Sequence, residues 1–170
     1  MLSSITNTLN DLLSNRILVI DGAMGTMIQR EKLTDTDFRG ERFANHNIPL
    51  IGNNDILSLT RPDIILKIHK AYLASGADII ETNSFNSNSI SQSDYALESI
   101  VYELNYESAK LAKQAATEFT ANNPNKPRFV AGSIGPSNQT CSISPDINKP
   151  GLRKTNFDIM AKAYHEQISG

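Results

Sequence analysis

The sequence predicts an α/β fold in which a parallel sheet is built from repeated strand–helix units. Four short apolar runs, at residues 17–20, 55–59, 77–82 and 128–134, have the length and composition of buried strands. Longer stretches in which apolar residues recur with helical spacing separate these runs. Because strands that alternate with helices favour parallel crossover connections, we expect the order β-α-β-α-β-α-β-α.

Helical spacing predicts where the intervening helices lie. Residues 2–14 carry an apolar stripe, which predicts a lead-in helix within residues 1–16, ahead of the main domain at residues 17–170. The other expected helices cover residues 23–30, 62–76, 95–119 and 157–168. Two polar stretches, residues 32–54 and 135–154, have no clean period and are expected to be long loops, which tend to be functional.

The composition excludes several classes of protein. The 170 residues carry 16 basic and 18 acidic side chains, and no basic block is available for nucleic acid or a membrane surface. No apolar run approaches the roughly 18 residues of a membrane span. We also expect no secretory signal and a cytoplasmic location. The single cysteine, Cys141, excludes a disulfide framework or a multi-thiolate metal site built from this chain alone.

Polar residues follow the predicted strands at the points where those strands end. Asp21 and Gly22 follow the first strand, Glu81 and Asn83 end or follow the third, and Asn138 follows the fourth. Ligands of parallel α/β folds bind at the carboxyl ends of strands. We therefore expect any functional site at this edge of the sheet.

Two carboxylates at one edge suit an ammonium group or acid–base chemistry, which makes Asp21 and Glu81 candidates for either role. An equally weighted alternative is that each caps the helix that follows it. The turn at Gly22 and Ala23 leaves backbone N–H groups open to an anion, although many such turns need glycine and bind nothing.

The remaining polar candidates carry weaker signals. Asn83 and Asn138 are able to bond a polar ligand, but asparagine is also a common turn former. The three histidines have no spacing typical of a metal site. Cys141 has no neighbouring His or Lys in the sequence that would activate it, so a structural thiol is favoured over a nucleophile.

Six stretches together resemble one family. They are residues 19–26 (VIDGAMGT), 37–43 (DFRGERF), 52–55 (GNND), 76–86 (GADIIETNSFN), 131–138 (AGSIGPSN) and 142–146 (SISPD). From about residue 17 onward the chain resembles the N-terminal homocysteine-binding module of cobalamin-dependent methionine synthase. The resemblance implies part of a 5-methyltetrahydrofolate–homocysteine S-methyltransferase of methionine biosynthesis, an amino-acid biosynthetic transferase with a TIM-type (β/α)₈ barrel.

The resemblance also implies a mechanism and roles for the candidate residues. Zinc lowers the pKa of the homocysteine thiol, and the thiolate attacks the methyl group of methylcobalamin. Asp21 and Glu81 would hold the ammonium group, and the backbone around Gly22 and Ala23 the carboxylate. Two asparagines would shape the floor or rim of the pocket, namely Asn83 and Asn138.

The predicted elements supply only part of such a barrel. A (β/α)₈ barrel takes about 250 residues, and we count four units here, so we expect an incomplete barrel formed by the first half of the module. The zinc ligands of the family are expected beyond Gly170. The isolated chain is therefore expected to hold neither zinc nor cobalamin and to be inactive. Its expected partners are homocysteine, the methyltetrahydrofolate and cobalamin modules of its own polypeptide, and a second copy that covers the open barrel edges.

Two other functions stay open on the sequence. The first is a stand-alone zinc-dependent homocysteine S-methyltransferase that uses betaine or S-methylmethionine, although the stretches at 37–43 and 52–55 favour the synthase. The second is a non-catalytic, amino-acid-binding or inactive fragment.

Overall fold

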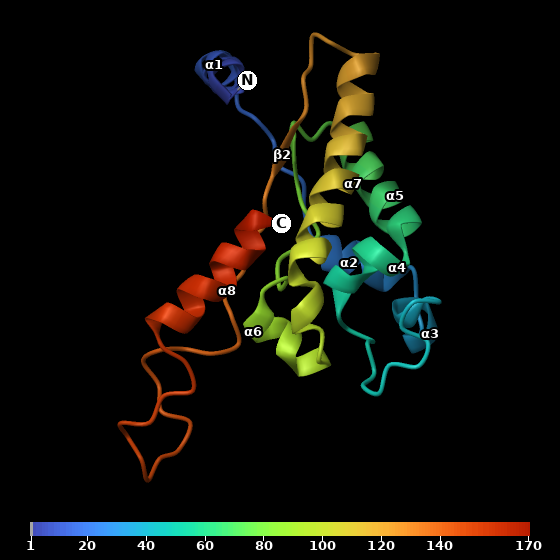
Figure 1. Cartoon of the computed structure of the whole chain (residues 1–170). Coiled ribbons are helices and arrows are strands. Elements are labelled where there is room, and N and C mark those ends of the chain that lie inside the picture. The colour runs from blue at the N-terminus through green and yellow to red at the C-terminus, as the bar shows by residue number, and fades with distance from the viewer. Residues whose placement is uncertain (1) are drawn as a thin grey trace.

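The computed structural model describes residues 2–170, so Met1 of the predicted lead-in segment lies outside the described part. The chain forms a helical body beside a small parallel sheet (Figure 1). The main helices and strands are α1 (Leu2–Asn15), α2 (Met24–Arg30), α3 (Asp35–Arg39), α4 (Leu57–Thr60), α5 (Pro62–Ala74), β1 (Ile79–Glu81), α6 (Ser89–Gln92), α7 (Val101–Asn122), β2 (Phe129–Ala131) and α8 (Phe157–Ser169). No helix in this described range is long and apolar enough to cross a membrane.

The sheet is parallel, as the sequence predicts. β1 pairs with β2 so that Ile80 lies opposite Val130 and Glu81 opposite Ala131. Ile20 adds one parallel bridge to Ile79, which aligns residues 17–20 with the other side of β1. The carboxyl ends of all three segments therefore lie at one edge of the sheet.

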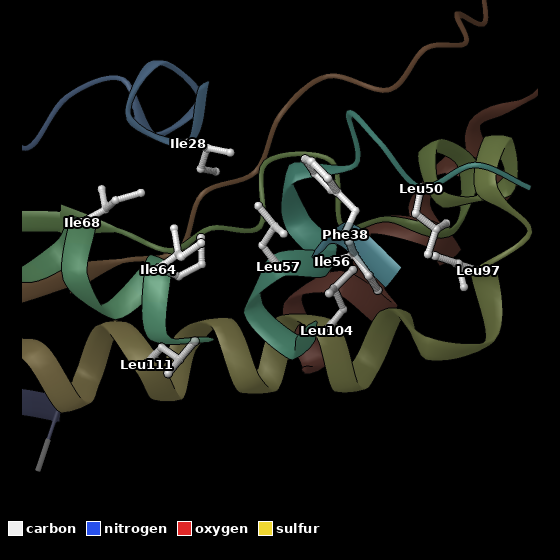
Figure 2. Packing of buried hydrophobic residues seen from close by; sticks show 11 residues of the cluster. Ile28, Phe38, Leu50, Ile56, Leu57, Ile64, Ile68, Leu97, Leu104 and Leu111 are labelled. Atoms are coloured by element: carbon white, nitrogen blue, oxygen red, sulfur yellow. The ribbon is translucent and has the colours of Figure 1, made fainter. Parts of the chain in front are cut away.

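The main core lies between α5, α7 and the short helices that precede α5 (Figure 2). α5 begins with Pro62, which needs no backbone N–H partner at that position, and buries Ile64 and Ile68 along one face. Leu104 and Leu111 of α7 meet this face, and Figure 1 shows the two helices side by side. A second cluster, in which Ile80 of β1 packs with Leu73 of α5 and Ala112 of α7, holds the sheet against these helices.

The predicted second strand at residues 55–59 is wrong. Asn54–Ile56 forms a 3₁₀ turn that leads into α4, and the Arg61 N–H donates to the Leu57 carbonyl at 2.9 Å. A short buried run is typical of a strand or of a buried helix, and here Ile56 and Leu57 enter the helical core. The sheet therefore contains three segments instead of the four units expected from the sequence.

The expected first strand is reduced to one isolated bridge, and its predicted burial is wrong. Ile17 is 88% exposed, and more than half of the surface of Val19 and Ile20 is also exposed. Only Ile20 forms a ladder bridge. In the described part of the chain, the face of this segment away from β1 carries no strand partner.

Two further predictions need correction, one in its content and one in its boundary. The predicted loop at residues 32–54 contains α3, whose start is fixed by a capping box between Thr34 and Asp37. The long helix predicted from residue 95 begins instead at Val101, after two 3₁₀ turns. The helices predicted at residues 2–14, 62–76 and 157–168 are confirmed within two residues at each end.

Asp78 fixes the amino end of β1 to the segment that leads out of α1. Both of its carboxylate oxygens accept hydrogen bonds from the Arg16 guanidinium at 2.8 Å, and the Val19 N–H donates to one of them at 2.9 Å. The residue is only 1% exposed. Arg16 and these hydrogen bonds lower the pKa of Asp78 to about 2.

We predict that Asp78→Asn lowers the free energy of unfolding by about 2–3 kcal/mol at pH 7, because charge-assisted hydrogen bonds to Arg16 are lost. The folded-state pKa lies below the usual value near 4, so the carboxylate stabilises the fold above that pH and loses its contribution as the pH falls toward 2. Urea titrations at several pH values measure the difference. Asp63→Asn, at an exposed pair with Arg61, is the control. A difference between wild type and Asp78→Asn that stays constant down to pH 2 would contradict this assignment.

Candidate functional site

A hollow of about 300 Å³ opens where the three sheet segments end. The turn at residues 21–25 lines this pocket together with Ser133 and five residues that follow or end β1, namely Glu81, Thr82, Asn83, Phe85 and Asn86. Asn54 and Asp55 complete the lining. The carboxyl edge of the sheet thus carries a pocket, as the positions of the polar residues predict.

Asp21 lines the pocket at the start of this turn. Its N–H donates to the Ile79 carbonyl at 2.9 Å, and its Oδ2 accepts a hydrogen bond from the Glu81 N–H at 3.1 Å. Its other carboxylate oxygen, Oδ1, is buried and has no hydrogen-bond partner among the described residues. A buried acceptor without a partner costs free energy, so a donor from a ligand would be favoured there.

The pocket is acidic and lacks a balancing positive charge. Burial raises the pKa of Asp21 to about 6, and the nearby Glu81 carboxylate contributes to the same shift. The lining contains three carboxyl groups, from Asp21, Asp55 and Glu81, and no Lys, Arg or His. Such a surface favours a ligand with a positively charged group.

The alternative in which Asp21 and Glu81 cap helices is wrong. The residue at the N-cap of α2 is Ala23, and no side chain caps that helix. The first helix after Glu81 is α6, which is capped by Asn88. Both acidic side chains instead line the pocket.

The glycine-containing turn packs closely against its neighbours. A Cβ atom at Gly22 would lie 3.3 Å from the Tyr72 Oη, which is tighter than ordinary contact. Gly22, Ala23 and Met24 all line the pocket, so the chain approaches the hollow with its backbone. This leaves room for a ligand to contact main-chain groups.

Asp55 is a pocket residue that the sequence analysis missed. It is 3% exposed, and its Oδ1 accepts hydrogen bonds from the Asn86 N–H and the Ser87 hydroxyl, both at 2.9 Å. Burial raises the pKa of Asp55 to about 6. The sequence did contain a signal, because a carboxylate follows the turn at residue 52 and comes directly before an apolar run. We assigned this carboxylate to a strand, so it was not considered as a pocket residue.

The two predicted asparagines lie in different places. Asn83 lines the pocket, and its amide nitrogen donates to the Asn54 carbonyl at 2.8 Å and to the Ser58 hydroxyl at 3.1 Å. Asn138 lies outside this pocket in a neighbouring hollow, where it donates to Asp94 Oδ2 at 2.7 Å. The structure therefore brings together Asp21, Gly22, Ala23, Glu81 and Asn83, but not Asn138.

Phe85 forms the apolar part of the pocket wall and is held by Gly135. The Gly135 N–H donates to the Phe85 carbonyl at 2.9 Å. A Cβ atom at residue 135 would lie 2.6 Å from two ring carbons and the carbonyl oxygen of Phe85. Only glycine allows this close approach, so residue 135 positions the aromatic ring.

The donor set of the described residues does not fit zinc. Nowhere between residues 2 and 170 do three or more His, Cys, Asp or Glu side chains form a group able to hold a metal ion. Catalytic zinc takes at least three protein ligands. Cys141 is exposed, and its thiol lies 3.2 Å from the Met160 sulfur instead of next to a second thiolate.

Comparison with known proteins identifies the family. A family model described as homocysteine S-methyltransferase matches residues 18–170. The chain belongs to the homocysteine S-methyltransferase family. The matched range contains the whole sheet and every residue that lines the pocket.

Solved structures of the homocysteine methyltransferase MmuM from Escherichia coli share the fold. The oxidized form is 26% identical with a TM-score of 0.59 over 75% of this chain, and the apo form is 25% identical with a TM-score of 0.53 over 77%. The metallated form, at 24% identity and a TM-score of 0.58, shows the fold alone. The chain spans 40% of the length of the oxidized form.

We predict that Gly135→Ala lowers the free energy of unfolding by about 1–3 kcal/mol, because the new methyl group overlaps Phe85. Gly132→Ala is the matched control, since a Cβ atom there meets nothing within 4 Å. Chemical denaturation of both variants measures the difference. Equal stability of the two variants would show that residue 135 does not hold the ring.

Proposed function

We propose that the pocket binds the zwitterionic amino-acid end of homocysteine. The observation that carries the proposal is the buried Asp21 Oδ1, which has no partner in the described part of the chain and belongs to a residue that lines a pocket without basic residues. An ammonium group donates up to three hydrogen bonds and supplies the missing positive charge. Membership of the homocysteine S-methyltransferase family supports the choice of amino acid.

The two ends of the amino acid would contact different groups of the pocket. The ammonium group would lie between Asp21 and Glu81, while the carboxylate would accept hydrogen bonds from the backbone at Gly22 and Ala23. Asn83 would act indirectly, because its amide nitrogen already bonds Asn54 and Ser58. The apolar side chains of Met24 and Phe85 would contact the methylene groups of the ligand.

The complete enzyme is proposed to transfer a methyl group to the homocysteine thiol. We favour methylcobalamin as the donor, as in methionine synthase, because of the resemblance over residues 37–43 and 52–55. A stand-alone enzyme that uses betaine or S-methylmethionine is the second candidate, supported by the likeness to MmuM. Under either candidate, the described residues would hold the amino acid and would not supply the zinc ligands.

Additional strand–helix units are proposed to complete a barrel around this pocket. This proposal is supported by the exposed apolar residues of the segment at 17–20 and by the outer side of β2, which pairs with no strand among the described residues. A second copy of the chain is the alternative cover for the same edges.

The binding experiment uses isothermal calorimetry of the 170-residue chain with homocysteine and with methionine. We predict that Asp21→Asn weakens binding about 10- to 100-fold, because a charge-assisted hydrogen bond is lost. Asparagine still accepts the bond from the Glu81 N–H, so the local fold is retained. Asp63→Asn is the charge-matched control on the surface. Unchanged affinity in Asp21→Asn would refute the proposed ammonium site.

The same affinity should depend on pH in a defined direction. Because the pKa of Asp21 in the free protein is about 6, its carboxylate is ionised above that value and protonated below it. Binding of a cation requires the ionised form, so we predict that affinity falls as the pH drops from 7 to 5 and that this dependence is weaker in Asp21→Asn. Affinity that rises on acidification would contradict the assignment.

Zinc analysis tests the proposal that the described residues hold the amino acid but do not supply the zinc ligands. We predict that the purified chain loses its zinc to a weak chelator, because the described residues lack the three ligands that zinc needs. Retention of about one equivalent of zinc would contradict this prediction. Atomic absorption before and after dialysis provides the measurement.

A further inference from the structure

A second, smaller hollow of about 170 Å³ lies beside the proposed amino-acid pocket. The two hollows share Asp55 and Asn86 in their walls. The rest of the second lining consists of Gly52, Asn53, Ser91, Asp94, Tyr95 and Asn138. Apart from Gly52, every residue in this lining has a side chain that carries an oxygen atom, and none is basic.

Ser91 lines this hollow and carries a buried hydroxyl without a partner among the described residues. The residue is 8% exposed, and its Oγ makes no hydrogen bond to any described residue. Its backbone N–H is already used, because it donates to Asn88 Oδ1 at 2.9 Å. A hydroxyl oxygen has two lone pairs, so it is able to accept a hydrogen bond or to ligate a cation.

Asp55 adds a carboxylate without an opposite charge. Its Oδ1 accepts bonds only from neutral donors, Asn86 and Ser87, and no ion pair to it is formed within residues 2–170. Asp94 lies at the same hollow but is exposed, and its Oδ2 already accepts from the Asn138 amide. One buried negative charge therefore remains unbalanced.

We propose that this second hollow binds one small monovalent cation, ligated by oxygen atoms of Asp55 and Ser91 and completed by water and neighbouring oxygen atoms. Hard cations prefer oxygen ligands. The side chains of this hollow supply oxygen atoms as ligands. The single buried carboxylate of this hollow matches one positive charge. A divalent ion would need more carboxylate ligands than the one buried group supplies.

An alkali-metal ion and an ammonium ion would both bind to these oxygen atoms. Comparison of the protein in different chloride salts distinguishes them. The melting temperature of the 170-residue chain is measured by calorimetry at pH 8 in KCl, NaCl, NH₄Cl and tetramethylammonium chloride of equal ionic strength. Tetramethylammonium is too large and has no hydrogen to donate, so it serves as the reference. We expect the melting temperature in at least one of the other three salts to exceed the reference by about 2–5 °C.

Two variants assign the response to the hollow. Asp55→Asn keeps an oxygen that accepts from Asn86 and Ser87 but removes the charge, and Ser91→Ala removes only the unpartnered hydroxyl. Both are expected to lose the ion-specific rise. In tetramethylammonium chloride Ser91→Ala should be as stable as wild type, because no hydrogen bond is lost.

Asp63→Asn and Ser99→Ala, at exposed positions outside the hollow, should keep the response. Equal melting temperatures in all four salts would overturn the proposal. So would a rise that persists in Asp55→Asn or in Ser91→Ala, or a response confined to added CaCl₂ or MgCl₂. Asp21→Asn, which removes the carboxylate of the proposed ammonium site, should keep the response. A response that is lost in Asp21→Asn but kept in Asp55→Asn would place the cation in the first pocket and overturn the proposal, so this result is distinguishable from a failure of the homocysteine site.

Discussion

Parallel pairing along β1 is the constraint on which the candidate site depends. The bridge from Ile20 to Ile79 sets the register, and the next hydrogen bonds of the ladder involve Asp21, through its N–H to Ile79 and its carboxylate to the Glu81 N–H. A shift of one residue would turn the Asp21 side chain to the other side of the sheet. The position of the buried Oδ1 is therefore a consequence of strand register and not of the loop that follows.

The two ends of β1 show how the same type of side chain serves opposite purposes. At the amino end, Asp78 is buried against Arg16, its pKa is lowered to about 2, and its charge contributes to stability. At the carboxyl end, Asp21 is partly buried without a basic partner, and its pKa is raised to about 6. A buried carboxylate without a counter-charge lowers the stability of the folded protein. Such a loss of stability is typical of residues in binding sites.

The sequence predicted the parts of the fold in which local pattern and packing agree. The helix at Pro62–Ala74 and the pairing of Ile79–Glu81 with Phe129–Ala131 follow from apolar spacing, and so does the convergence of Asp21 with Glu81. Residues 55–59 failed because a run of buried residues has no period that separates strand from helix. Asp55 and Asn138 were misjudged because their partners, Asn86 and Asp94, are far away in the sequence, and no local rule predicts such contacts.

The acidic lining also bears on where the reactive end of the ligand would lie. A zwitterion held with its ammonium group at Asp21 and its carboxylate at the Gly22 backbone would direct its side chain away from both, past Phe85. Phe85 is 52% exposed, so the part of the pocket lining that it forms borders solvent. A thiol in that position would lie where additional strands would meet the pocket. The proposed zinc ligands on later strands and the proposed amino-acid contacts are then complementary, because one set of residues fixes the zwitterion and the other activates the sulfur atom.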